Sequence, residues 1–167
     1  MISQAEKEES RVSVAGRKAR AYRPSVDATR DVVRKKLGDI PEEVFSSRKM
    51  FIDVSRKGIP GDWVKSVVEA TGLREAFLGI LNIDSGNLSR VYRRKALPKE
   101  TSEEVLDAVR LLRQAADVWE SYDLAMQWFK SPVPALGDER PLDLIDTFEG
   151  RRWISQVLNK IEYGEFS

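Results

Sequence analysis

The fold is decided within residues 58–98, which read GIPGDWVKSVVEATGLREAFLGILNIDSGNLSRVYRRKALP. Apolar residues recur at helical spacing after Asp62, which we expect to cap a first helix, and Gly72 is a typical stop signal. A second helix is expected from Arg74 to Leu81. Asn82 follows it and is one of the few non-glycine residues that tolerate the left-handed backbone of a tight turn.

A third helix is expected to begin at Asp84 or Ser85 and to run until Pro98 prevents its continuation. Two short helices joined by three or four residues are typical of a helix-turn-helix. The first turn of its second helix enters the major groove, while Arg and Lys further along neutralise phosphates. We therefore expect operator DNA to contact Ser85, Asn87, Ser89, Arg90, Arg93, Arg94 and Lys95. Taken by themselves, the charges also suit a basic surface helix that has no DNA partner, which is the alternative to DNA binding.

Beyond residue 98 the signals are again helical. The run Thr101 to Glu104 has the pattern of a capping box and opens a long helix with one apolar face, which should link two modules. Ser121 should cap the next helix, a short helix is expected over 142–146, and Thr147 should cap a last helix that ends at Gly164. The side chains expected to face inward include Leu124, Trp128, Phe129, Trp153, Ile154, Val157, Leu158 and Ile161.

Residues 1–57 are polar and basic and are assigned only loosely. We expect residues 1–25 to form a weakly ordered arm. Residues 41–57 are ambiguous, because their start suits a helix whereas Met50 to Val54 could equally form a short strand.

The composition argues against an enzyme. The 167 residues contain no cysteine and no histidine, so disulfides, thiolate zinc sites and the common nucleophile–base relays are unavailable. We expect neither a cofactor nor a metal ion. No apolar run approaches the roughly 20 residues needed to span a bilayer, and the polar N-terminus does not resemble a signal peptide, so a cytoplasmic protein without membrane contact is expected.

The charge is unevenly distributed along the chain. The first 98 residues contain 20 Lys and Arg against 13 Asp and Glu, whereas the remainder contain 8 against 14. A basic front half beside an acidic back half suits one polyanionic partner and one different partner, although ordinary charge scatter is the alternative.

The C-terminal block contains an ordered set of residues at characteristic spacing. It comprises Trp128, Pro132, Pro134, Ala135, Leu136 and Gly137, then Pro141, Leu142, Leu144 and Thr147, then Ile161, Glu162, Tyr163 and Gly164. This block resembles the toxin-binding domain of Xre/MbcA/ParS-type antitoxins. Val133 stands where that family often has Asn, and Ile145 replaces a common Leu. With the helix-turn-helix region included, the resemblance covers roughly residues 58–167.

The resemblance implies a paired toxin, most often of the RES-domain type, which degrades NAD. It also implies that the C-terminal domain covers the toxin's active-site cleft while the N-terminal domain represses the operon. Large aromatic side chains near the C-terminus suit such a contact. We expect the toxin to contact Arg151, Arg152, Glu162, Tyr163, Gly164, Glu165, Phe166 and Ser167.

Together these observations predict an all-α protein, with a helix-turn-helix DNA-binding module and a small C-terminal helical toxin-binding domain. The expected divisions are an extension over 1–57, an Xre-like domain with its connecting helix over 58–120, and a toxin-binding domain over 121–167. A homodimer is expected, because palindromic operators mirror two-fold proteins. The alternative is a repressor whose C-terminal domain only oligomerises.

Overall fold

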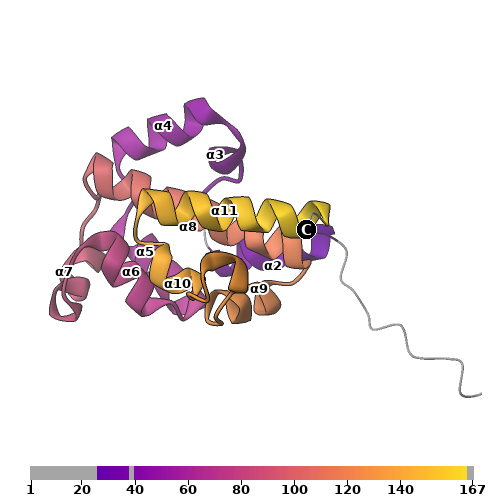
Figure 1. Cartoon of the computed structure of the whole chain (residues 1–167). Coiled ribbons are helices and arrows are strands. Elements are labelled where there is room, and N and C mark those ends of the chain that lie inside the picture. The colour runs from indigo at the N-terminus through magenta and orange to yellow at the C-terminus, as the bar shows by residue number, and fades with distance from the viewer. Residues whose placement is uncertain (1–25, 38–39, 165–167) are drawn as a thin grey trace, which may run out of the picture.

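The computed structural model describes residues 26–37 and 40–164, which are helical and contain no strand. The all-α prediction is confirmed. Figure 1 shows the order of the elements. They are α2 (Val26–Leu37), α3 (Glu43–Ser46), α4 (Arg48–Lys57), α5 (Gly61–Thr71), α6 (Arg74–Leu81), the 3₁₀ turn η1 (Ser85–Asn87), α7 (Leu88–Tyr92), α8 (Lys99–Trp119), α9 (Tyr122–Phe129), the 3₁₀ turn η2 (Pro134–Leu136), α10 (Pro141–Leu144) and α11 (Phe148–Tyr163).

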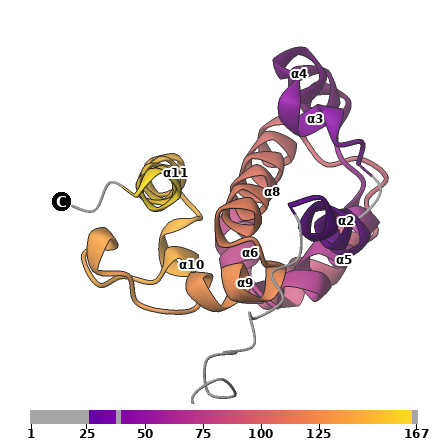
Figure 2. The ribbon, with the colours of Figure 1, turned by 90° about the vertical axis from the view of Figure 1, so that its right-hand side faces the viewer.

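The long helix α8 is the centre of the fold. It packs against α2, α4, α6, α9 and α11, and Figure 2 shows α11 and the pair α3–α4 on different sides of it. Its apolar residues recur every three or four positions, which gives a buried face. That face consists of Val105, Leu106, Ala108, Val109, Leu111, Leu112, Ala115 and Ala116. The buried side chains from α2 to α11 form one contiguous core.

The predicted start of α8 is wrong. The helix begins at Lys99, after an extended Pro98, and no side chain caps it. Ser102 lies inside the first turns instead, where its buried hydroxyl donates to the Leu97 carbonyl at 3.2 Å and accepts from the Ile59 amide at 3.1 Å. The hydroxyl that resembled part of a cap therefore ties α8 to the segment before α5, a tertiary contact that local spacing does not reveal.

The ambiguous stretch 41–57 is helical throughout α3 and α4. Ser47 caps α4 by accepting from the Met50 amide, and the hydroxyl of Ser55 donates to the Phe51 carbonyl at 2.7 Å. Phe51 and Ser55 lie one turn apart and are both buried, on a helix that packs against α8. This burial selects a helix over a strand. The arm expected over residues 1–25 lies outside the described residues.

The helix α5 begins two residues earlier than predicted, at Gly61 instead of directly after an Asp62 cap. Pro60 occupies the cap position without a side-chain bond, and the Asp62 carboxylate accepts from the adjacent Trp63 amide inside the first turn. Gly61 leads the helix because another backbone approaches it closely: a Cβ atom there would lie 2.0 Å from the Val91 carbonyl oxygen. The predicted end is confirmed, since Gly72 adopts the left-handed conformation.

The C-terminal helices begin where their caps predict. Ser121 accepts from the Leu124 amide, and Thr147 accepts from the Gly150 amide. The predicted short helix over 142–146 instead covers Pro141–Leu144. Leu124 and Trp153 were expected to face inward but are 50% and 43% exposed.

The two errors have the same cause. The helix α9 turns Tyr122, Ala125, Met126 and Phe129 toward the core, and α11 turns Ile154, Val157 and Leu158 inward. Each set already fills the narrow stripe that a helix can bury. Leu124 and Trp153 lie outside those stripes and reach solvent.

Candidate functional site

The first candidate surface is the basic segment around α7. A tight turn separates it from α6, with Asn82 in the left-handed conformation at φ 50° as predicted, and with the Ile83 amide donating to the Leu78 carbonyl. Leu88, the first residue of α7, is buried, and the Gly61 amide donates to the Arg94 carbonyl at 2.9 Å. The segment is therefore fixed to α5 by backbone contacts rather than by its charged side chains.

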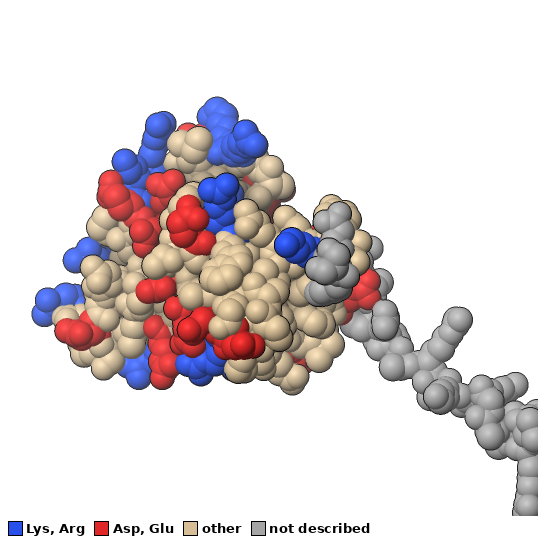
Figure 3. Space-filling view, in the orientation of Figure 1, with Lys and Arg blue, Asp and Glu red and all other residues tan. Residues whose placement is uncertain are grey.

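All seven residues predicted to contact DNA are exposed. They do not lie on one continuous helix, because α7 ends at Tyr92, six residues before the predicted limit at Pro98. Arg93, Arg94 and Lys95 therefore follow the helix, and Ser85 and Asn87 lie in η1 before it. Figure 3 shows Lys and Arg side chains at the α7 end of the molecule.

The charges of this segment are not neutralised internally. Arg90, Arg93, Arg94 and Lys95 form no ion pair with any carboxylate among the described residues. Tyr92 lies between these residues in the sequence and is half-buried. Burial raises the pKa of its hydroxyl, the charge of nearby Arg74 lowers this pKa, and the charge of Glu69 raises it. Unpaired surface cations attract a polyanion at low free-energy cost, because no existing pair must be broken.

The second candidate surface is the outer face of α11. Three aromatic side chains protrude from this helix: Phe148 is 66% exposed, Trp153 43% and Tyr163 72%. Arg152, also exposed, lies 3.7 Å from Glu149. Exposed aromatic residues beside arginine are characteristic of protein interfaces.

The structure separates the residues predicted to contact a toxin into three groups. Arg152, Glu162, Tyr163 and Gly164 are exposed, and Gly164 ends α11 in the left-handed conformation, as predicted. Glu165, Phe166 and Ser167 lie outside the described residues. Arg151 is buried and does not belong to the surface of α11.

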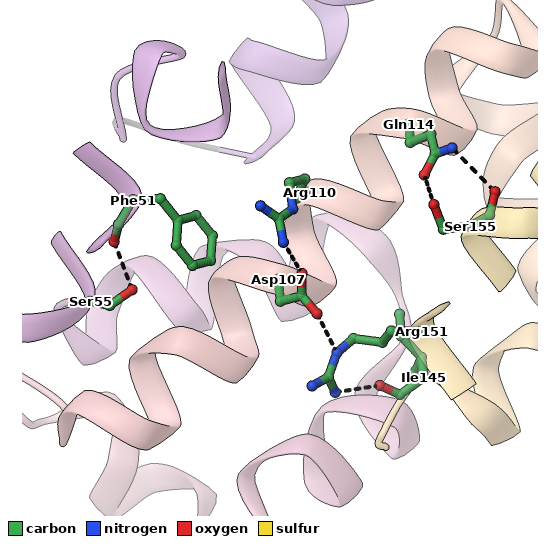
Figure 4. A network of polar contacts seen from close by, with 8 residues as sticks. All are labelled: Phe51, Ser55, Asp107, Arg110, Gln114, Ile145, Arg151 and Ser155. Atoms are coloured by element: carbon green, nitrogen blue, oxygen red, sulfur yellow. Dashed lines mark hydrogen bonds and ion pairs between the residues drawn. The ribbon is translucent and has the colours of Figure 1, made fainter. Parts of the chain in front are cut away.

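Arg151 instead joins α11 to α8. Its Nε donates to the Asp107 carboxylate at 2.7 Å, and its Nη1 donates to the Ile145 carbonyl at 3.0 Å, as Figure 4 shows. Asp107 also pairs with Arg110. One turn further along, the Gln114 side chain accepts from the Ser155 hydroxyl at 2.8 Å. These contacts fix the rotation of α11 about its axis, and so determine which residues face outward.

Sequence reasoning missed Phe148 and Trp153 as surface residues. The available signal was spacing: Ile154, Val157 and Leu158 already complete an inward stripe, which leaves position 153 beside it. The described residues contain no group of three or more Asp or Glu placed to bind a metal ion. Across the same residues, no helix is both long and apolar enough to span a bilayer.

Known proteins resemble the chain in this C-terminal part and beyond it. Residues 114–164 match the family model described as the antitoxin Xre/MbcA/ParS C-terminal toxin-binding domain. The chain is 28% identical over 127 residues to the "Prs ADP-ribosylating antitoxin" of Sphingobium sp. (strain YBL2), covering 70% of this chain and 80% of that protein. It is 25% identical over 152 residues to "Antitoxin Xre" of Yersinia enterocolitica serotype O:8 / biotype 1B (strain NCTC 13174 / 8081), covering 89% and 99%.

Proposed function

Because the chain is an antitoxin of the Xre/MbcA/ParS type, we propose that it acts in a type II toxin-antitoxin system, where it neutralises its toxin and represses its own operon. The observation that carries the proposal is the outward aromatic face of α11, which lies within the matched domain. The chain itself performs no catalysis in this scheme. Its two candidate surfaces serve two partners.

The toxin binds the outer face of α11. Phe148, Trp153 and Tyr163 supply large apolar contact areas with few rotatable bonds, and Arg152 supplies a planar charged group. Glu162, Tyr163 and Gly164 extend the contact at the end of the helix. Arg151 acts as a positioning residue through Asp107. A helix of this kind covers the active-site cleft of the toxin and excludes its substrate.

We propose that the toxin is a RES-domain protein that consumes NAD. The name of the Sphingobium relative supports the consumption of NAD, because it associates that antitoxin with ADP-ribosylation, and ADP-ribosyl transfer draws on NAD. The RES domain itself is proposed from the resemblance to the antitoxin family. Incubating the isolated toxin with NAD tests the assignment. We expect NAD to disappear, and we expect equimolar antitoxin to stop the loss.

Operator DNA binds the basic segment. Asn87 and Arg90 form hydrogen bonds with base edges, and the small side chains of Ser85 and Ser89 approach the same edges closely. The cations at positions 93–95 contact phosphates. A homodimer places two such segments on a palindromic operator. Arg90→Ala should weaken operator binding by about 1–3 kcal/mol. The control Lys65→Ala, on the exposed face of α5, should not.

The exposed aromatic face also suits a second function, self-association of a plain repressor. In that case the face of α11 buries its rings against another copy of this chain. Light scattering distinguishes the two functions, because Phe148→Ala with Trp153→Ala would convert the plain repressor to monomers. In the antitoxin, the same pair of changes leaves the oligomeric state unaltered.

A growth assay tests the proposed function. Production of the protein encoded beside this chain should arrest growth, and co-production of this chain should restore it. The double change Phe148→Ala and Trp153→Ala should abolish the rescue, whereas Leu124→Ala, which removes a comparably exposed apolar side chain from α9, should preserve it. A harmless neighbour, or full rescue by the double variant, would refute the proposal.

A further inference from the structure

A groove of about 390 Å³ lies between α8 and α11, beside the aromatic face. Phe148 forms part of its rim, and its charged lining consists of Asp107, Arg110, Arg151 and Arg152. Three guanidinium groups and one carboxylate leave the groove with an excess of positive charge. The described lining contains no second carboxylate, and Glu149, which lies 3.7 Å from Arg152, is outside the groove.

The neighbouring groove, between α8 and the helices α2 and α3, shows that this imbalance is not general. That groove has a similar volume, about 410 Å³, and also contains several arginines. Its three arginines, Arg30, Arg110 and Arg113, are matched in number by three carboxylates, those of Glu42, Asp117 and Glu162. Arg113 pairs with Glu42 at 2.7 Å, Arg30 pairs with Asp117 at 3.5 Å, and Arg110 lies between the two grooves and lines both. The excess of positive charge therefore distinguishes the groove beside α11.

Donors remain available at the α8–α11 groove. Arg110 and Arg151 share the single carboxylate of Asp107, and Arg110 also lies over the Phe51 ring at 4.7 Å (Figure 4). An arginine has five N–H donors, and the contacts of Arg110 among the described residues use only part of them. Arg152 is exposed and its pair with Glu149 is long at 3.7 Å, so it can change partner at little cost.

Resting on the proposed function, we propose that this groove receives an acidic side chain of the toxin, an Asp or Glu carboxylate. Arg110 and Arg152 bind the carboxylate, while an apolar residue of the same toxin segment packs on Phe148. The groove is continuous with the outer face of α11, so one toxin surface reaches both. An arginine fork matches a carboxylate in geometry, and partial removal of water on docking strengthens the pairing.

Binding of the purified toxin to the full-length chain, measured by calorimetry at low and high sodium chloride, tests this inference. At low salt, Arg110→Ala and Arg152→Glu should each weaken toxin binding about tenfold or more. The deficit should shrink at high salt, because screening already weakens the wild-type pairing. The matched control Lys65→Ala removes an exposed cation from α5 and should bind like the wild type.

Arg110→Ala could weaken toxin binding indirectly, by loosening the contact between Arg110 and Phe51 of α4. The variant Phe51→Leu tests for this indirect effect. It removes the ring beneath Arg110 but retains the guanidinium, and it should preserve toxin binding. Wild-type affinity in both groove variants would overturn the inference, as would a loss of operator affinity with toxin affinity intact. Failure of the wild-type chain to bind the toxin at all would refute the proposed function as well. The two failures are thus distinguishable.

Discussion

Replacing Arg151 by alanine should destabilise the protein far more than the same change at the next residue. The Arg151 side chain is 6% exposed and makes two charge-assisted hydrogen bonds, to Asp107 and to the Ile145 carbonyl. Each such bond contributes roughly 1.5–3 kcal/mol, and leaving a buried charge unpaired costs more. Asp107 retains Arg110 as a partner and is itself 21% exposed, which reduces the loss.

We therefore expect Arg151→Ala to lower the free energy of unfolding by about 2–3 kcal/mol. For a chain of this size, that corresponds to a fall in melting temperature of about 5–10 °C. Arg152→Ala removes a side chain that is 62% exposed and pairs at 3.7 Å, so its cost should stay below about 0.5 kcal/mol.

Circular dichroism recorded during thermal unfolding gives the melting temperatures of both variants under one condition. The physical claim is that burial, and not the presence of an ion pair, determines the contribution of these neighbouring arginines. Equal melting temperatures for the two variants would refute it. Below its melting temperature, Arg151→Ala should also bind the toxin more weakly, because α11 loses the contact that fixes its rotation, while its operator affinity should be unchanged.

Gly61→Ala should destabilise the fold by about 1–3 kcal/mol and weaken operator binding, because its Cβ would lie 2.0 Å from the Val91 carbonyl oxygen. Gly86→Ala, with open space around it, should leave chemical denaturation unchanged. Thr147→Ala should cost about 1 kcal/mol through loss of the α11 cap, measured by urea unfolding. Burial raises the pKa of the Tyr122 hydroxyl to about 12, so this hydroxyl stays protonated to a higher pH in the folded state than in the unfolded state. The contribution of Tyr122 to the free energy of unfolding should therefore be complete below pH 10 and should be lost as the pH rises toward 12. Tyr122→Phe should make stability less dependent on pH across this range.

The helix ends were largely determined by short-range chemistry. Gly72, Asn82 and Gly164 adopt the left-handed conformations that their positions predicted, and Ser121 and Thr147 accept the expected amide bonds. These signals succeed because a cap or a left-handed turn involves atoms within a few residues of one another. The all-α class followed from them.

Tertiary packing decided the rest. Ser102 looked like part of a cap but bonds to Ile59 across the fold, and Met50–Val54 became helix because α4 buries one side against α8. Neighbouring arginines at 151 and 152 have the same local chemistry, yet one is buried and the other exposed. From residue 58 onward, the sequence alone indicated roughly where the helices lie along the chain. Which side of each helix meets α8, and hence which side chains remain for a partner, depends on contacts between residues distant in sequence, and only the folded structure specifies them.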